Sequence, residues 1–190
     1  ANDSGALIMA ETTTQEGFIL RDVVAPFQIS SGVGSLWFEC RIKPLLIATN
    51  EMAFVAGLMD TTAASATIPL TMTTGAIADC NFVGFHKPVA NTTAFDTSYK
   101  ANGVTAVEVN SDVGTLAAAT WIKLGMKFDT ATNVLSFYIN GVKQASTKTI
   151  PNATGTDFPA DVALGLVVGM CVGSAASDNE LHIDWWECVQ

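Results

Sequence analysis

The sequence predicts an all-β fold: a single domain built as a sandwich of two antiparallel sheets. Three observations lead to this prediction. Apolar residues recur at every second position, turn motifs separate these runs, and no window has the spacing of a stable amphipathic helix. Hydrophobic residues make up 49% of the 190 residues and charged residues 14%, which excludes intrinsic disorder. A chain of this length can also bury a core without disulfide or metal crosslinks.

Alternation is clearest in four runs, at residues 36–43, 121–129, 134–140 and 181–186. In each run one set of side chains faces a core and the other set faces outward. Further strands are expected at residues 18–24, 52–59, 81–86, 104–109 and 163–171. The best helical window, residues 116–120, is too short to form a helix alone.

Turn chemistry separates the expected strands. Asn140-Gly141 is the strongest hairpin signal, because both central residues of such a turn adopt positive φ. Asn102-Gly103 is a second turn, and residues 129–133 join two alternating runs as a longer loop. Residues 61–78 are uncharged and rich in Thr and Ala, so they are expected to form a long loop or weak edge strands.

The domain boundary is expected near residue 16, with residues 17–190 forming one domain. Residues 1–16 contain the apolar patch Ala6-Leu7-Ile8-Met9-Ala10. This patch fits either a first strand or an arm that packs on a neighbouring molecule, and the sequence leaves both interpretations open.

The net charge of −9, with only nine Lys and Arg residues, excludes several classes of partner. Nucleic acids and anionic membranes both require clustered basic residues, which this chain lacks. The longest dense apolar run, residues 163–172, is about half the length of a membrane-spanning helix. The four cysteines form no Cys-x-x-Cys pair and three lie in apolar runs, so we expect reduced, buried thiols.

Catalytic and metal-binding motifs are absent from the sequence. Neither His86 nor His182 accompanies a nucleophile motif, and there is no phosphate loop or calcium loop. Glu180, His182 and Asp184 would share one strand face, where a solvated surface is a commoner explanation than a metal site. Glu180 and Asp184 also have the spacing of a glycosidase carboxylate pair, kept as a minor alternative. We therefore expect no catalytic residue, no metal, no cofactor and no enzymatic activity.

Three tryptophans, Trp37, Trp121 and Trp186, fall on the outward sets of their strands. Outward tryptophans in a chain with few charges favour a face covered by a partner, although they could also stack on sugars. We expect them to bind a partner together with Leu7, Ile8 and Met9. A homotrimer or homodimer is the expected assembly.

Two longer stretches carry a resemblance to known families. Residues 121–129 with 134–141 resemble the tryptophan hairpin of the concanavalin A-like jelly roll, and residues 181–190 resemble its closing strand. Residues 34–190 are also similar to virion structural proteins of tailed bacteriophages, through the runs at 36–43, 54–58, 81–86 and 158–161. The glucanase motif Glu-x-Asp-x-x-Glu and the lectin calcium loop are missing, so no catalytic or metal residue of those families carries over.

The resemblance implies a non-enzymatic virion structural protein, most simply a capsid decoration protein of the phage head. It would bind the major capsid protein at the virion surface after assembly in the host cytoplasm, and stabilise the shell by mass action. The alternative is a carbohydrate-binding, lectin-like module of a tail fibre or head fibre, with a glycan as its partner.

Overall fold

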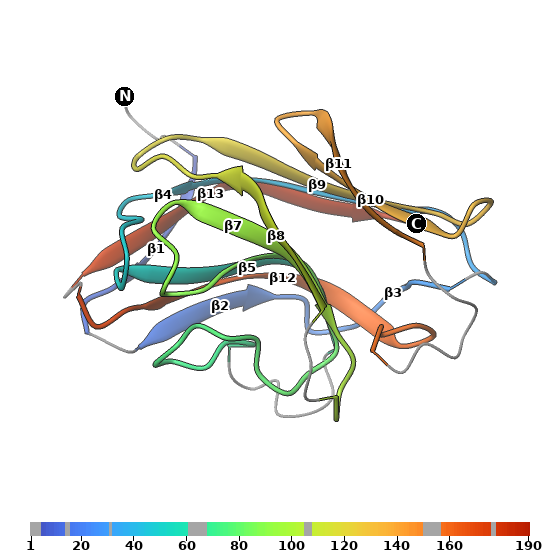
Figure 1. Ribbon diagram of the computed structural model, residues 1–190, viewed down its shortest axis with the longest axis horizontal. Coiled ribbons are helices and arrows are strands. Elements are labelled where there is room, and N and C mark those ends of the chain that lie inside the picture. Colours follow the sequence, from blue (N-terminus) through green and yellow to red (C-terminus); the bar gives the residue numbers. More distant parts are fainter. Residues whose placement is uncertain are drawn as a thin grey trace.

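The protein consists of two antiparallel β-sheets stacked face to face (Figure 1). The computed structural model describes residues 5–13, 16–30, 32–60, 68–104, 108–149, 157–175 and 178–190. Within these ranges every regular element is a strand, and no helix is long and apolar enough to span a membrane. The predicted all-β class and the two antiparallel sheets are confirmed.

The chain crosses several times between the two sheets, and the strands near both ends of the chain are shared between them. The six-stranded sheet has the order β1 (Leu7–Glu11), β13 (Asn179–Val189), β4 (Leu36–Pro44), β9 (Ile122–Asp129), β10 (Val134–Ile139), β11 (Val142–Thr149). The seven-stranded sheet has the order β2 (Gly17–Arg21), β12 (Ala163–Val172), β5 (Met52–Met59), β6 (Phe82–Lys87), β7 (Ala94–Lys100), β8 (Glu108–Thr115), with β3 (Phe27–Gln28) paired to β12.

The main hydrophobic core lies between the two sheets. The predicted inward sets of β4, β9 and β10 all face it, and every one of these strands meets aromatic or aliphatic side chains from the other sheet. Phe85 of β6 contacts Phe137 of β10 edge to face, with ring centroids 5.5 Å apart. Burying one such phenylalanine contributes about 1.5–3 kcal/mol, so this layer supplies most of the stability.

The seven-stranded sheet is also apolar on its outer face. All eight residues of β5 are buried, which requires cover on both sides of the strand. A second apolar cluster forms there, where Val55, Phe82 and Val167 pack against Ile68 and their neighbours. The covering residues come from segment 68–80, which we call the covering segment. It runs along the side of this sheet that faces away from the six-stranded sheet (Figure 1).

The covering segment refines one prediction from the sequence. Residues 61–67 of the predicted loop lie outside the described residues, whereas 68–80 form a loop with a single bridge, Leu70 to Ile77. The apolar side chains of the covering segment explain why it packs on the sheet. In a free loop they would be exposed to water, whereas the apolar outer face of β5 buries them. The segment is therefore part of the packed structure.

Other strand predictions have mixed outcomes. Most of the apolar patch at residues 6–10 lies in β1 (Leu7–Glu11), which pairs with β13. The Asn140-Gly141 turn is confirmed, with φ of 50° and 81°. Of the strand expected at 104–109, residues 105–107 lie outside the described residues, Val104 closes a turn with Ala101, and residues 108–109 belong to β8. Strand β7 was missed, since the consecutive polar residues Asp96, Thr97 and Ser98 break the alternation in a strand that is almost entirely buried.

Two glycines facing each other, Gly57 of β5 and Gly84 of β6, allow close approach of the backbones. A methyl group at position 57 would collide with the carbonyl oxygen of Val83 and lie 2.7 Å from the Cα of Gly84. We expect Gly57→Ala to lower the free energy of unfolding by about 1–3 kcal/mol, the usual cost of overpacking. Urea unfolding followed by circular dichroism measures this change.

The matched control is Gly32→Ala, where the nearest atom to an added methyl is 3.8 Å away. This variant should unfold at the same urea concentration as the wild type. Equal stability of Gly57→Ala and Gly32→Ala would show that β5 and β6 can move apart at no cost.

Candidate functional site

The outer face of the six-stranded sheet carries Trp37, as the alternation predicted. Its indole packs edge to face against Tyr138, with ring centroids 5.0 Å apart. Gly125 lies between them on β9, and a Cβ there would be 3.4 Å from both the Trp37 ring and Tyr138. Because Gly125 has no side chain, the two aromatic groups lie close over the strand and hold each other in place.

Trp121 lies on the same face, immediately before β9, but other side chains of the protein already pack against its ring. The Arg41 guanidinium lies 4.8 Å from the ring centroid and the Lys43 ammonium 5.3 Å. His182 contacts the ring edge to face, with centroids 6.5 Å apart. Such cation–π contacts contribute about 0.5–1 kcal/mol at exposed sites. The neighbouring strand therefore covers much of this predicted partner-binding side chain.

The prediction for Trp186 is wrong, because its side chain packs against the core. A register shift between Ile183 and Trp185 places Trp185 opposite Arg41 and Trp186 opposite the buried Cys40. Directly paired residues share a face of the sheet, so the shift moves Trp186 inward and Trp185 outward. The extra residue of this bulge reverses the alternation that the sequence indicated.

The three predicted residues of β1 separate into two groups. Leu7 and Ile8 remain 47% and 51% exposed, whereas Met9 is half-buried and packs against the core. β1 forms one edge of its sheet and pairs only with β13. Two exposed apolar side chains thus lie on a strand that leaves one row of peptide groups without a strand partner among the described residues.

A shallow groove of about 300 Å³ lies near the opposite edge of the same sheet. Lysine, hydroxyl and aromatic side chains line it. Strands β9 to β11 and the loop between β9 and β10 supply the lining residues: Lys127, Asp129, Thr132, Val134, Ser136, Tyr138 and Lys143. No sequence pattern indicates this groove, because its residues come together only through the register of three strands.

The carboxylates that the sequence singled out each have a basic partner. Glu180 accepts a hydrogen bond at 2.8 Å from His182, and Asp184 is paired with Arg41. The hydrolytic pair and the metal-binding triplet considered from the sequence are therefore not assembled. In the part of the chain that the structure describes, no three His, Cys, Asp or Glu side chains are grouped to hold a metal ion.

His86 faces the covering segment from β6 and is buried. Its Nε2 lies 2.6 Å from the carbonyl oxygen of Gly75, which only accepts, so Nε2 carries the proton. Burial lowers the pKa of His86 below its usual value, although the Gly75 hydrogen bond and the charge of Asp96 oppose this shift. His86 thus anchors the covering segment as a neutral imidazole.

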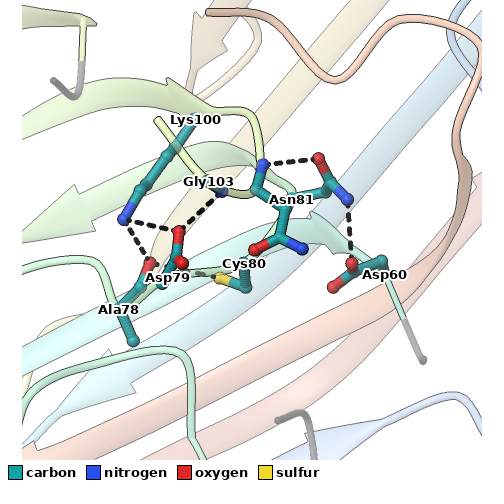
Figure 2. Close-up of polar contacts among 8 residues, drawn as sticks. Asp60, Ala78, Asp79, Cys80, Asn81, Lys100 and Gly103 are labelled. Atoms are coloured by element: carbon teal, nitrogen blue, oxygen red, sulfur yellow. Dashed lines mark hydrogen bonds and ion pairs between the residues drawn. The ribbon is translucent and has the colours of Figure 1, made fainter. Parts of the chain in front are cut away.

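A polar network fixes the far end of the covering segment, as Figure 2 shows. The Lys100 ammonium donates to the carbonyl oxygen of Ala78 at 3.0 Å and pairs with Asp79 at 3.4 Å. Asp79 also accepts a hydrogen bond from the amide of Gly103, and this bond is the main cause of its lowered pKa.

The neighbouring residue Asn81 extends this network to the end of β5. Its side-chain amide donates to Asp60 at 2.8 Å and accepts from the Asn102 backbone (Figure 2). The network therefore connects the covering segment and the adjoining Asn81 to β7, to the turn that follows β7 and to the end of β5. Its role is structural.

The four cysteines are free, as the sequence predicted. Burial raises the pKa of Cys80 to about 12, of Cys171 to about 11 and of Cys188 to about 12, and raises that of Cys40 still further. Nucleophilic reactions require the thiolate, so none of these thiols is reactive at neutral pH.

Comparisons with known proteins show the fold and no closer relationship. The sequence matches no family model and no curated protein. An endo-β-1,4-glucuronan lyase from the fungus Trichoderma reesei is 10% identical with a TM-score of 0.64, covering 96% of this chain and 80% of the lyase. A family 16 endo-glucanase from Bacteroides ovatus is 13% identical with a TM-score of 0.58, covering 100% and 83%. The carbohydrate recognition domain of Emp47p is 8% identical with a TM-score of 0.61, covering 98% and 89%.

These likenesses confirm the concanavalin A-like jelly roll, and at such low identity they show the fold alone. They also correct the prediction that the chain is not an enzyme. Polysaccharide lyases and family 16 glucanases share this sandwich over almost the whole chain. The exclusion relied on linear motifs, but a sheet can assemble catalytic groups from separate strands, so missing motifs do not exclude catalysis.

Replacing Lys100 should loosen the covering segment. In Lys100→Met the carbonyl oxygen of Ala78 loses its ammonium donor and keeps only the weak thiol donor of Cys80, a change that costs about 1–3 kcal/mol. We expect faster hydrogen exchange at the amides of Thr71 and Ala78, which are bonded within the segment, and little change in β4 and β9. Lys143→Met, on the other sheet, is the control. Unchanged exchange at Thr71 and Ala78 would show that the apolar contacts alone hold the segment.

Acidification should weaken the protein through His86. The pKa of His86 is lowered in the folded state, so the unfolded chain takes up a proton first as the pH falls. The stability from this residue is complete above about pH 6.5 and is lost as the pH falls through the folded pKa. Urea unfolding between pH 7 and pH 5 should therefore show a smaller pH dependence for His86→Gln than for the wild type. Identical slopes would contradict this role.

Proposed function

We propose that the chain is a virion structural protein of a tailed bacteriophage, one that decorates the outer surface of the head. The observation that carries this proposal is the edge strand β1, where Leu7 and Ile8 expose apolar side chains beside a row of peptide groups that has no strand partner among the described residues. Natural proteins usually protect such an edge, because it readily pairs with another chain. A capsid subunit that added a strand or an apolar ridge here would satisfy both features.

Further support comes from the resemblance of residues 34–190 to phage virion proteins and from the low charged content of 14%. The major capsid protein is the proposed partner, and many copies bound at the virion surface would stabilise the shell by mass action. A homotrimer or homodimer would match the threefold and twofold positions that capsid lattices provide.

The alternative function is glycan binding as a lectin-like module of a tail fibre or head fibre. It is supported by the aromatic pair Trp37 and Tyr138 on an open sheet face, and by a fold that Emp47p uses in a carbohydrate recognition domain. Aromatic rings in such positions can pack against the apolar faces of sugar rings.

The capsid proposal is tested with heads that lack this protein, mixed with purified wild-type chain or with the double variant Leu7→Asp, Ile8→Asp. We expect the wild type to sediment with the heads and to appear as regular density on their outer surface by electron microscopy. The charged variant should bind at least tenfold more weakly, because two buried apolar contacts become desolvated carboxylates. Point variants are preferable to deletion of residues 1–16, since β1 pairs along its length with β13.

Val142→Asp is the matched control, because Val142 is 64% exposed but lies at the other side of the sheet. It should bind heads as the wild type does. Absence of the wild-type chain from purified virions, or equal binding of the Leu7 and Ile8 variant, would refute the proposal.

A further inference from the structure

The groove over β9, β10 and β11 is independent of the proposed capsid contact. It lies beside one edge of the six-stranded sheet, whereas β1 forms the other edge (Figure 1). A molecule attached to a capsid through β1 would therefore leave the groove open, and the groove needs its own explanation.

The groove exists because β10 and β11 do not pair regularly. Ser136 pairs with Thr147, but Tyr138, two residues later, pairs with Lys143, so two steps along β10 correspond to four along β11. An irregularity of this kind bends the longer strand and spreads the pair locally. It leaves a depression over β10 with Lys127 on one side and Lys143 on the other.

The charges in the groove favour an anion. Lys127 and Lys143 contribute two positive charges and Asp129 one negative charge. The only ion pair among them joins Lys127 to Asp129 at 3.7 Å, too long for a hydrogen bond. Two ammonium groups and one carboxylate thus line the groove, which gives it a net positive charge on a protein whose total charge is −9.

The floor of the groove holds the hydroxyl group of Ser136. Ser136 is only 5% exposed and lines the groove. Its hydroxyl is not one of the buried polar groups left without a partner. Because a hydroxyl group both donates and accepts, it can pair with a hydroxyl group of a ligand in the groove.

An aromatic wall completes the site. Tyr138 is fixed against Trp37, and Val134 lies further along the same strand. These side chains give the groove an apolar side that a small inorganic anion could not use. A ligand that fits must combine a negative charge, hydroxyl groups and a compact apolar surface.

We propose that this groove binds a carboxylated sugar residue of an acidic polysaccharide. The carboxylate accepts hydrogen bonds from Lys127 and Lys143, and ring hydroxyls pair with Ser136 and Asp129. The apolar face of the ring packs on Tyr138. A neutral sugar would bring no negative charge to the two ammonium groups, and a simple anion would make no contact with Asp129 or Tyr138. The proposal goes beyond the capsid role and also specifies the ligand for the glycan-binding alternative.

Isothermal titration calorimetry of the full chain tests the site. The probes are tetrasaccharides of galacturonate and of glucuronate, with cellotetraose as the neutral comparator and sodium acetate as the simple anion. We expect at least one uronate tetrasaccharide to bind, and cellotetraose and acetate to bind at least tenfold more weakly. Lys127→Gln and Lys143→Gln should each weaken uronate binding about tenfold, since each removes a hydrogen bond to a charged group.

Two further variants separate this site from general charge effects. Ser136→Ala should weaken binding several-fold, whereas Lys43→Gln, which removes a positive charge on the same sheet outside the groove, should leave it unchanged. Circular dichroism checks that each variant is folded. Failure of both uronates to bind, equal binding of cellotetraose or acetate, or wild-type affinity in both lysine variants would overturn the proposal. None of these outcomes bears on head binding through β1.

Discussion

The burial of β5 on both of its faces is the constraint on which the arrangement of the whole molecule depends. A strand without a single exposed residue must lie inside a three-layer structure, so the seven-stranded sheet needs the opposite sheet on one side and the covering segment on the other. Gly57 and Gly84 then allow β5 and β6 to approach closely beneath that cover. The location of the open surfaces follows from this constraint.

Because the covering segment packs on the outer face of the seven-stranded sheet, the surfaces open to partners are the outer face of the six-stranded sheet and its two edges, β1 and β11. This face separates into three parts with different chemistry. β1 offers an apolar edge, the region around Trp121 is filled by basic residues of the chain itself, and the groove near β11 offers lysines beside an aromatic pair. The two proposed contacts, at β1 and at the groove, therefore lie at opposite edges of one sheet and would not compete.

Sequence reasoning was most successful where the hydrophobic pattern repeats without interruption. The alternation of β4, β9 and β10 predicted which side chains enter the core, and Asn140-Gly141 predicted its hairpin, because local residues determine both. The prediction failed at β13, where a bulge exchanges the faces on which Trp185 and Trp186 lie. The sequence does not reveal this bulge, because the extra residue does not alter the apparent alternation.

The parts of the structure that depend on distant residues were not predictable. β7 was overlooked because its polar residues are satisfied or buried only by contact with the covering segment and β8, as with Lys100 and Asp96. The groove arises from a register shift between β10 and β11, and pairing register is a property of the folded sheet. Catalytic groups can likewise come from separate strands, so the absence of linear motifs does not exclude enzymatic activity.

The unreactive thiols make this molecule convenient to label. Burial raises the pKa of all four native cysteines, so alkylating dyes that require a thiolate should react with them only slowly. One cysteine introduced at an exposed hairpin position such as Val142 would then be the single rapidly modified residue, with no need to remove the natural ones. A fluorophore attached there would report where on a phage particle or a polysaccharide gel the protein settles.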